Sequence, residues 1–423
     1  MKNYRLCLLL ILAVALVLRL AWMIAVPVDP VSDSFAYMTF ATHISQGHGM
    51  TWEPGMDRPT AYWPVGAAAL YALSYMVLGS EHLGPLVLNL MASMGCVWLT
   101  GELARHLYDS RTALTAAAIM AFMPSQIYFT TIYASEIFFN LAVLAAVLLW
   151  IHQGTQHAVL WGAIWTGTLL AVAAYIRPTA LLIPFLLTGL RLLETRRWGR
   201  PTTELAVMIT IMIVFIAPWS YRNHVAFDSF VPISTNGGAN LWMGNNPSNP
   251  GGGYMPLSED LKSFRNEAER DRRAKEIALK YIKDEPIEFV FRFGRKLRAT
   301  HERDTIGVVW NEPGLVGAYG SWALTPLKFA STVYWYGLMT VGATGAVMML
   351  RSGGRGISLL LPGTLIVYFT FVHAVIVAQD RYHYAAIPYL ALFGAVTLTS
   401  ILWTGLVNEH PPDRGGATES LQP

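Results

Sequence analysis

The chain has 423 residues, of which 54% are hydrophobic and only 13% are charged. Soluble domains carry about 25% charged residues, so this composition excludes an ordinary soluble enzyme. The mean hydropathy of +0.40 and the small net charge of +3 indicate a chain that lies largely in lipid and has no nucleic-acid partner.

Apolar stretches long enough to cross a bilayer recur along the chain. They predict an all-α polytopic membrane protein in which one transmembrane domain covers residues 1–407, and residues 408–423 form a disordered cytoplasmic tail. Cys7 and Cys96 both fall inside apolar stretches, which argues against a disulfide framework. About ten spans are expected, at 6–26, 84–104, 112–130, 134–151, 158–176, 179–193, 204–219, 327–350, 357–378 and 383–407.

The basic residues of the short connections set the orientation. They gather in alternate connections, which contain Arg105 and Arg111, the run from Arg191 to Arg200, and Arg351. These connections and both termini are therefore predicted to be cytoplasmic. Two long loops, 27–83 and 220–326, then lie outside.

Both external loops contain segments that we expect to lie on the membrane surface. In the first loop these are a short helix after Asp33 and the apolar segment 63–78, which is too short for an ordinary span. In the second loop they are a charged helix over 258–283 and another helix that begins at Pro286.

Ionisable side chains gather on the external side of this topology. A charged group at membrane depth costs roughly 2.5–3.5 kcal/mol even on mild scales, so the collection indicates a functional site, although each residue alone is equally well explained as an interface anchor. Guanidinium groups bind phosphate oxygens in pairs, and a nearby carboxylate suits a general base. The residues are Asp33, Arg58, Glu136, Arg177, Arg222 and Arg381.

The chain contains a series of short motifs: VSDSFAY (31–37), RPTAYWP (58–64), YASE (133–136), IRP (176–178), PWSYRN (218–223), VPISTNGGANLW (231–242), GNNP (244–247) and RY (381–382). Together they resemble the polytopic GT-C glycosyltransferases of families 39 and 83, which include protein O-mannosyltransferases and lipid A aminoarabinose transferases. The longest block, 218–247, is similar to an uncharacterised bacterial branch of family 39. The resemblance covers about residues 1–407.

The resemblance implies an inverting transfer of one monosaccharide from a polyprenyl-phosphate donor to a hydroxyl of a lipid, glycan or protein acceptor. It places the reaction at the outer face of a bacterial inner membrane. Asp33 matches the first-loop aspartate, which in these families acts as the base or orients the acceptor. Asp33 could instead, or in addition, cap the N-terminus of the short helix that follows it.

The remaining candidates divide by role. Glu136 is a second carboxylate or an ion-pair partner for an arginine, and the donor phosphate is expected at Arg58, Arg177, Arg222 and Arg381 with Tyr382. The amide side chains and the tryptophan ring of the block after Val231 fit sugar hydroxyl groups, although a purely structural turn explains the same residues equally well. A divalent ion near His301 would lack further ligands, so no cofactor or metal is required. The sugar and acceptor candidates are Asn236, Asn240, Trp242, Asn245, Asn246 and His301.

Two features depart from the related families. A single proline, Pro59, follows Arg58 where several family 83 members have a lysine before two prolines, and no large soluble domain follows the last span.

Two other functions stay open at this stage: a flippase for lipid-linked sugars, which would be expected to have two related halves, and a non-catalytic scaffold for envelope-glycan assembly. The sequence identifies neither the sugar nor the acceptor.

Overall fold

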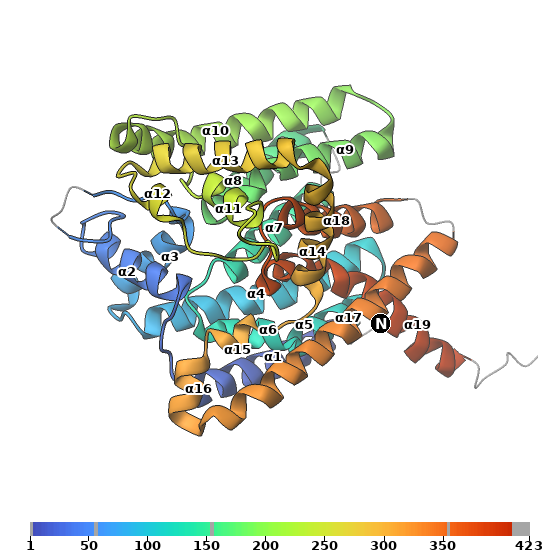
Figure 1. Cartoon of the computed structure of the whole chain (residues 1–423). Coiled ribbons are helices and arrows are strands. Elements are labelled where there is room, and N and C mark those ends of the chain that lie inside the picture. Colours follow the sequence, from blue (N-terminus) through green and yellow to red (C-terminus); the bar gives the residue numbers. More distant parts are fainter. Residues whose placement is uncertain (1–2, 55–57, 153–155, 353–355, 408–423) are drawn as a thin grey trace, which may run out of the picture.

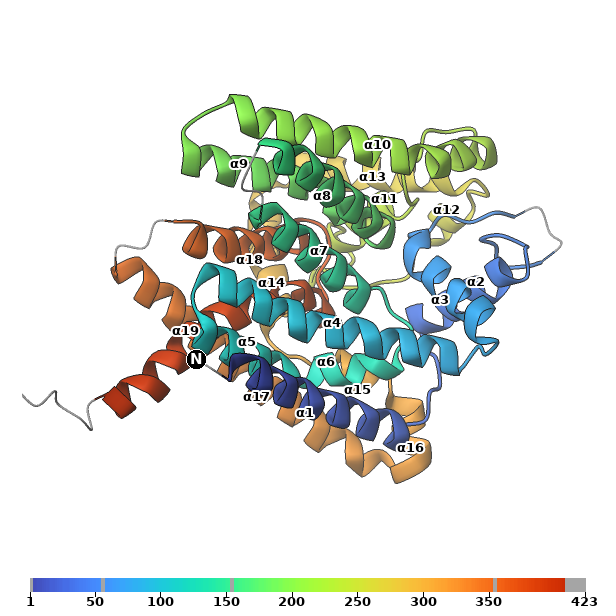
Figure 2. The same ribbon diagram turned by 180° about the vertical axis from the view of Figure 1, so that it is seen from behind.

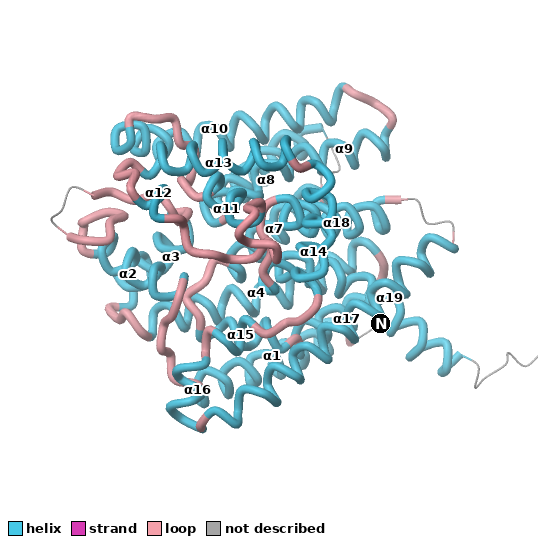
Figure 3. The backbone as a smooth tube through the Cα atoms, viewed as in Figure 1, coloured by secondary structure: helices cyan, strands magenta, loops and turns pink. Residues whose placement is uncertain are grey.

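The computed structural model describes residues 3–54, 58–152, 156–352 and 356–407 (Figure 1). Within these ranges the chain is helical, and the only β-type pairing is an isolated bridge between Thr51 and Pro59 (Figure 3). The predicted all-α fold is confirmed. The predicted disordered tail, 408–423, lies outside the described residues.

The helices of the first half are α1 (Tyr4–Ala25), α2 (Asp33–Ser45), α3 (Val65–Leu78), α4 (Leu83–Leu107), α5 (Ser110–Phe122), α6 (Pro124–Tyr128), η1 (Phe129–Thr131), α7 (Glu136–Ile151), α8 (Gln156–Ile176), η2 (Pro178–Leu182), α9 (Ile183–Thr195) and α10 (Gly199–Phe227). Those of the second half are α11 (Gly237–Gly244), α12 (Glu259–Lys262), α13 (Glu267–Asp284), α14 (Pro286–His301), α15 (Ile306–Val309), α16 (Glu312–Tyr319), η3 (Ser321–Ala323), α17 (Leu324–Arg351), α18 (Ile357–Val375), η4 (Asp380–Ala386) and α19 (Ile387–Val407).

Among the described residues, seven helical segments are long and apolar enough to cross a membrane, or eight if α5 and its bent continuation form one span. The chain is therefore a multi-pass membrane protein. Every predicted span coincides with a helix, but α7 and α18 are counted only among the shorter apolar helices, as is α3. The predicted number of about ten spans, and the surface position of α3, stay predictions.

The spanning helices pack in one continuous row. Figure 2 shows α10, α8, α7 and α4 side by side, and each contacts the next. The row continues from α4 to α5, then to α19 and α17, while α1 lies against α4 and α5. The start of α1, the α9–α10 connection and the end of α19 lie at one end of the molecule, and α2, α3 and α12 lie at the other (Figure 1).

The predicted span 112–130 is not one straight helix. It breaks between α5 and α6 with a bend of 59°, because Pro124 cannot donate a helical hydrogen bond. The carbonyl groups left free at the end of α5 accept from the buried guanidinium of Arg19, which contacts the oxygens of Met120 and Ala121 at 3.3 and 3.1 Å. Arg19 thus satisfies the carbonyl groups that the break leaves without helical partners.

Two helix boundaries, at the end of α10 and within the predicted helix 258–283, differ from the prediction. The span expected to end at 219 continues as α10 through Pro218 to Phe227, so Arg222 lies within a helix and not in a loop. The charged helix expected over 258–283 is two helices, because Ser258 and Asn266 each cap a new N-terminus with their side chains.

Candidate active site

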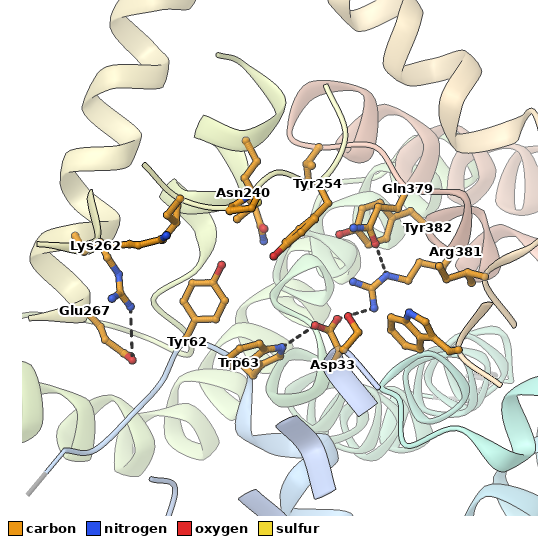
Figure 4. Close-up of a pocket in the computed structure, with 18 of the residues that line it drawn as sticks. Asp33, Tyr62, Trp63, Asn240, Tyr254, Lys262, Glu267, Gln379, Arg381 and Tyr382 are labelled. Carbon is orange, nitrogen blue, oxygen red and sulfur yellow. Dashed lines mark hydrogen bonds and ion pairs between the residues drawn. The ribbon is translucent and has the colours of Figure 1, made fainter. Parts of the chain in front are cut away.

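The carboxylate of Asp33 lies at the first turn of α2 and is bound from two sides (Figure 4). The indole N–H of Trp63, which stands just before α3, donates to Oδ1 at 3.1 Å. The guanidinium of Arg381 lies 2.7 Å from Oδ2, and its Nε donates to the side chain of Gln379 at 2.6 Å. The N-cap of α2 is Ser32, so Asp33 does not take the capping role.

The protonation state of Asp33 follows from these neighbours. Burial by itself would raise the pKa of the carboxyl group, but the charge and hydrogen bond of Arg381, the hydrogen bond of Trp63 and the charge of Arg177 outweigh it. The pKa is lowered from its ordinary value of 3.8. Asp33 is therefore an ionised acceptor throughout the neutral range.

A second carboxylate and a second arginine complete the cluster. Glu136 begins α7, is almost fully buried and forms an ion pair with Nη2 of Arg177. Nε of Arg177 donates to Ser135 at 2.9 Å. Nη1 of Arg381 lies 3.6 Å from Glu136, so it bridges the two carboxylates, and the four charges sum to zero.

Each guanidinium of this cluster keeps one terminal nitrogen free. Within the part of the chain that the structure describes, no hydrogen bond or ion pair engages Nη1 of Arg177 or Nη2 of Arg381. Both arginines line the same cavity. Two free N–H groups from two fixed cations are suited to the oxygens of a phosphate.

The segment that carries Arg381 is anchored at the end of α18. Nζ of Lys296, on α14, donates to the carbonyl oxygen of Val375 at 2.6 Å and contacts that of Ile376 at 3.4 Å. The backbone of Gly244 approaches the same place so closely that an added Cβ would lie 1.8 Å from the oxygen of Ile376. These contacts fix the backbone at the end of α18 and therefore the start of the segment that leads to Arg381.

A cavity of about 590 Å³ opens on one side of the Asp33–Arg381 pair. Its wall is rich in aromatic side chains, most of them from the two long loops 27–83 and 220–326, and it includes the charged residues Lys262, Glu267 and Arg270. The aromatic lining residues are Trp52, Tyr62, Trp63, Tyr254, Trp310 and Tyr382. We call this space the larger cavity.

A smaller cavity, of about 280 Å³, lies on the other side of the pair. Arg177 and Ser135 line it, and it shares Asp33, Arg381 and Tyr382 with the larger cavity. The ring of Tyr382 is kept in place by parallel stacking on His373, with the ring centres 4.1 Å apart.

An almost wholly apolar groove adjoins the smaller cavity. It lies between α3, α8 and α10, is lined by Val65, Leu73 and Pro218 among others, and shares Ile176 with the smaller cavity. The groove therefore leads from apolar helix surfaces to the position of Arg177.

The structure brings some of the predicted site residues together. Asp33, Glu136, Arg177, Arg381 and Tyr382 meet between the two cavities. Two of the predicted amide residues join them: Asn240 lines both cavities and Asn236 lines the smaller one.

Two predicted phosphate ligands lie elsewhere. Arg58 is exposed and lines neither cavity. Arg222 donates to the carbonyl oxygens of Thr60 and Met50 at 3.1 and 3.2 Å, and its guanidinium stacks on Trp219 at 4.7 Å. Arg222 thus ties the first external loop to α10.

Four predicted sugar ligands are occupied by internal contacts. Trp242 packs in a small hydrophobic cluster, and the side chain of Asn245 donates to main-chain carbonyl groups. The side chain of Asn246 accepts from the backbone N–H of Ser248 at 2.9 Å. The ring of His301 stacks on Trp335 with centres 5.8 Å apart.

The sequence interpretation missed the aromatic wall and the residue that assembles it. Glu267, at the start of α13, accepts from Thr60 Oγ1 at 2.8 Å, from the backbone N–H of Ala61 at 3.0 Å and from Thr235 Oγ1 at 3.0 Å. It joins the two external loops beside Tyr62. Aromatic clustering in the first loop was a visible signal, but nothing local marks Glu267.

Across the described residues, no group of three or more His, Cys, Asp or Glu side chains is placed to hold an ion.

Comparisons with known proteins place this fold. The family model for dolichyl-phosphate-mannose-protein mannosyltransferases matches residues 62–221, which is less than half of the chain. No curated protein sequence matches. The solved oligosaccharyltransferase of the archaeon Archaeoglobus fulgidus is similar in structure: in its apo form the TM-score is 0.59 at 12% identity, over 96% of this chain and 52% of that one.

Two further structures are similar. The Archaeoglobus fulgidus enzyme AglB, in complex with an inhibitory peptide and a dolichol-phosphate, matches with a TM-score of 0.56 at 14% identity over 100% of this chain and 53% of that one. ArnT of Cupriavidus metallidurans bound to undecaprenyl phosphate gives 0.46 at 14% identity, over 96% and 81%. The chain spans about half the length of the archaeal enzyme. The predicted resemblance to GT-C glycosyltransferases is confirmed, and the chain has the GT-C fold.

Proposed function

We propose that this chain, with its GT-C fold, is a glycosyltransferase that moves a monosaccharide from a polyprenyl-phosphate donor to an acceptor hydroxyl at the outer face of the membrane. The observation that carries the proposal is the contact between an ionised Asp33 and Arg381 at the junction of two cavities. A transferase with two substrates needs such a junction, because both must reach one carboxylate.

The donor fits the smaller cavity. Its phosphate would take the free nitrogens of Arg177 and Arg381, and its prenyl chain would follow the apolar groove that begins at Ile176. The larger cavity then receives the acceptor, since it also reaches Asp33 and is lined by residues of both long loops.

The proposed chemistry uses one carboxylate as the base. The acceptor oxygen attacks the anomeric carbon while its proton passes to Asp33, and the bond from that carbon to the phosphate oxygen breaks with inversion. The phosphate leaves with the electron pair, and the guanidinium groups stabilise its charge. General-base catalysis of this type contributes about 10²–10⁴-fold to a rate.

The test uses purified protein in nanodiscs with radiolabelled polyprenyl-phosphate sugars and a crude envelope fraction. Asp33→Asn keeps the hydrogen bond from Trp63 but removes the base, so we expect transfer to fall by about 10²–10⁴-fold while donor binding persists. Glu269→Gln, an exposed substitution on α13, is the matched control and should transfer normally. Undiminished transfer by Asp33→Asn would refute the proposal.

A further inference from the structure

We propose that the acceptor in the larger cavity is a carbohydrate chain without strong net charge, held against aromatic rings. This inference rests on the proposed function, because it names the acceptor class for that same site. The argument uses the rings, the charges and the backbone around the larger cavity in turn.

The aromatic residues that line the larger cavity are all Trp or Tyr, so each combines an apolar face with a polar N–H or O–H. Two of the faces are already covered: Arg381 lies 4.6 Å from the ring centre of Trp310, and His373 stacks on Tyr382. Arg270 lies 5.9 Å from the ring centre of Tyr62, and Trp52 packs edge-on against Phe40 and Trp63. Within the described residues, no ring or cation contact engages Tyr254, so its ring is the most open to a ligand. A pyranose ring presents flat C–H faces edged by hydroxyl groups, which matches this combination.

A side-chain amide lies beside the rings of Tyr62 and Tyr254. Figure 4 shows the hydroxyl ends of Tyr62 and Tyr254 pointing toward one another, with the side chain of Asn240 beside them. Among the described residues, no hydrogen bond engages the side-chain amide of Asn240. An unpaired amide offers both donors and an acceptor to sugar hydroxyls.

The charges in the larger cavity are already paired, which argues against a strongly anionic acceptor. Lys262 lies 2.7 Å from Glu259, and Arg270 lies 3.7 Å from Glu267. Arg381 pairs with Asp33. A polyanionic acceptor would require unpaired cations here, whereas hydroxyl groups require none.

The backbone around the larger cavity argues against a peptide. Extended peptides are commonly held by main-chain hydrogen bonds to a free strand edge. The part of the chain that the structure describes contains no strand, only the bridge between Thr51 and Pro59. Within the described residues, the larger cavity therefore offers an extended peptide no strand edge, whereas its rings and the amide of Asn240 offer contacts to a glycan.

The first experiment separates acceptor binding from donor binding. Tyr254 is 67% exposed and Phe230, which lines neither cavity, is 79% exposed, so alanine at either position should leave the fold intact. In the nanodisc assay with an envelope glycan fraction, Tyr254→Ala should raise the KM for the acceptor by about tenfold and leave that for the donor unchanged. Phe230→Ala should change neither. Equal acceptor KM values in the two variants would overturn the inference.

The second experiment identifies the bond that forms. Linkage analysis of the labelled product should find the new sugar attached to a hydroxyl of another sugar, and protease treatment should not release the label. Label on a serine or threonine of a protein, or on a phosphate group, would overturn the carbohydrate acceptor while leaving the proposed transfer intact. No transfer by the wild-type protein would instead reject the proposed function.

Discussion

Two arginines give the two carboxylates of the site different surroundings. Asp33 keeps 23% of its side chain exposed beside Arg381, whereas Glu136 keeps 1% beside Arg177. Only the exposed carboxylate has access to a substrate in the larger cavity. Removing one partner of a buried pair typically costs about 3–5 kcal/mol. Because Glu136 contacts both arginines and lines neither cavity, we propose that it positions them.

The first prediction at the residue scale concerns pH. Because Arg381 and Trp63 lower the pKa of Asp33, the carboxylate is ionised above the ordinary value, and wild-type transfer should decline only as the pH falls below it. Trp63→Phe removes one stabilising hydrogen bond, so the acid limb of the rate profile should move to higher pH. Arg381→Ala should move it further in the same direction. Rate–pH profiles at saturating donor check this, and an unmoved limb in both variants would contradict it.

The link between the external loops is an interaction between elements. Glu267 receives three hydrogen bonds from the loop before α3 and the loop before α11, and Arg222 holds the same first loop from α10. This arrangement places Trp63 against Asp33. An acidic residue on a charged helix therefore acts on the site through the backbone of the first loop.

We expect Glu267→Ala to loosen the first loop. The loss of hydrogen bonds to a charged acceptor should speed amide hydrogen exchange of Ala61 by about tenfold or more, whereas Glu269→Ala on the same helix should not. Hydrogen-exchange mass spectrometry of the peptide that contains this residue checks the prediction. Equal protection of the Ala61 amide in both variants would show that the hydrogen bonds of Glu267 do not hold the first loop.

Helix contact also predicts which glycine of α17 is needed. An added Cβ at Gly345 would lie 2.0 Å from the carbonyl oxygen of Phe393 on α19, whereas Gly337 has nothing within 4 Å. Gly345→Ala should therefore destabilise the protein by about 1–3 kcal/mol. Gly337→Ala should be neutral or stabilising by up to about 1 kcal/mol. Thermal unfolding in nanodiscs compares the two, and equal melting temperatures would contradict the close packing.

At the scale of the whole molecule, the proposed site requires one orientation. The row of helices from α10 to α17 runs between the end that carries α2, α3 and α12 and the end that carries the α9–α10 connection (Figures 1 and 2). Residues of the first of these ends line the larger cavity, and the basic run from Arg191 to Arg200 lies at the second. The positive-inside rule puts the basic end in the cytoplasm. The external placement of the site is therefore testable without any substrate.

A labelling experiment tests this orientation. Cys7 and Cys96 lie within α1 and α4, so background labelling should be low. In intact cells a membrane-impermeant maleimide should label Tyr254→Cys and should label Ser352→Cys only after the membrane is opened. The reverse pattern would place the cavities in the cytoplasm and remove the proposed donor route.

The amino-acid sequence alone was enough to predict the membrane class, the all-α fold and the approximate position of the apolar helices, because these depend on hydrophobicity within short windows. It also indicated the residue types of a phosphate site. The three-dimensional packing was needed to show that Arg381 contacts Asp33 and that Arg177 lines the same cavity, while Arg58 and Arg222 lie elsewhere. Such contacts join segments more than a hundred residues apart in the chain, so no local pattern distinguishes an arginine that faces a cavity from one that holds a loop.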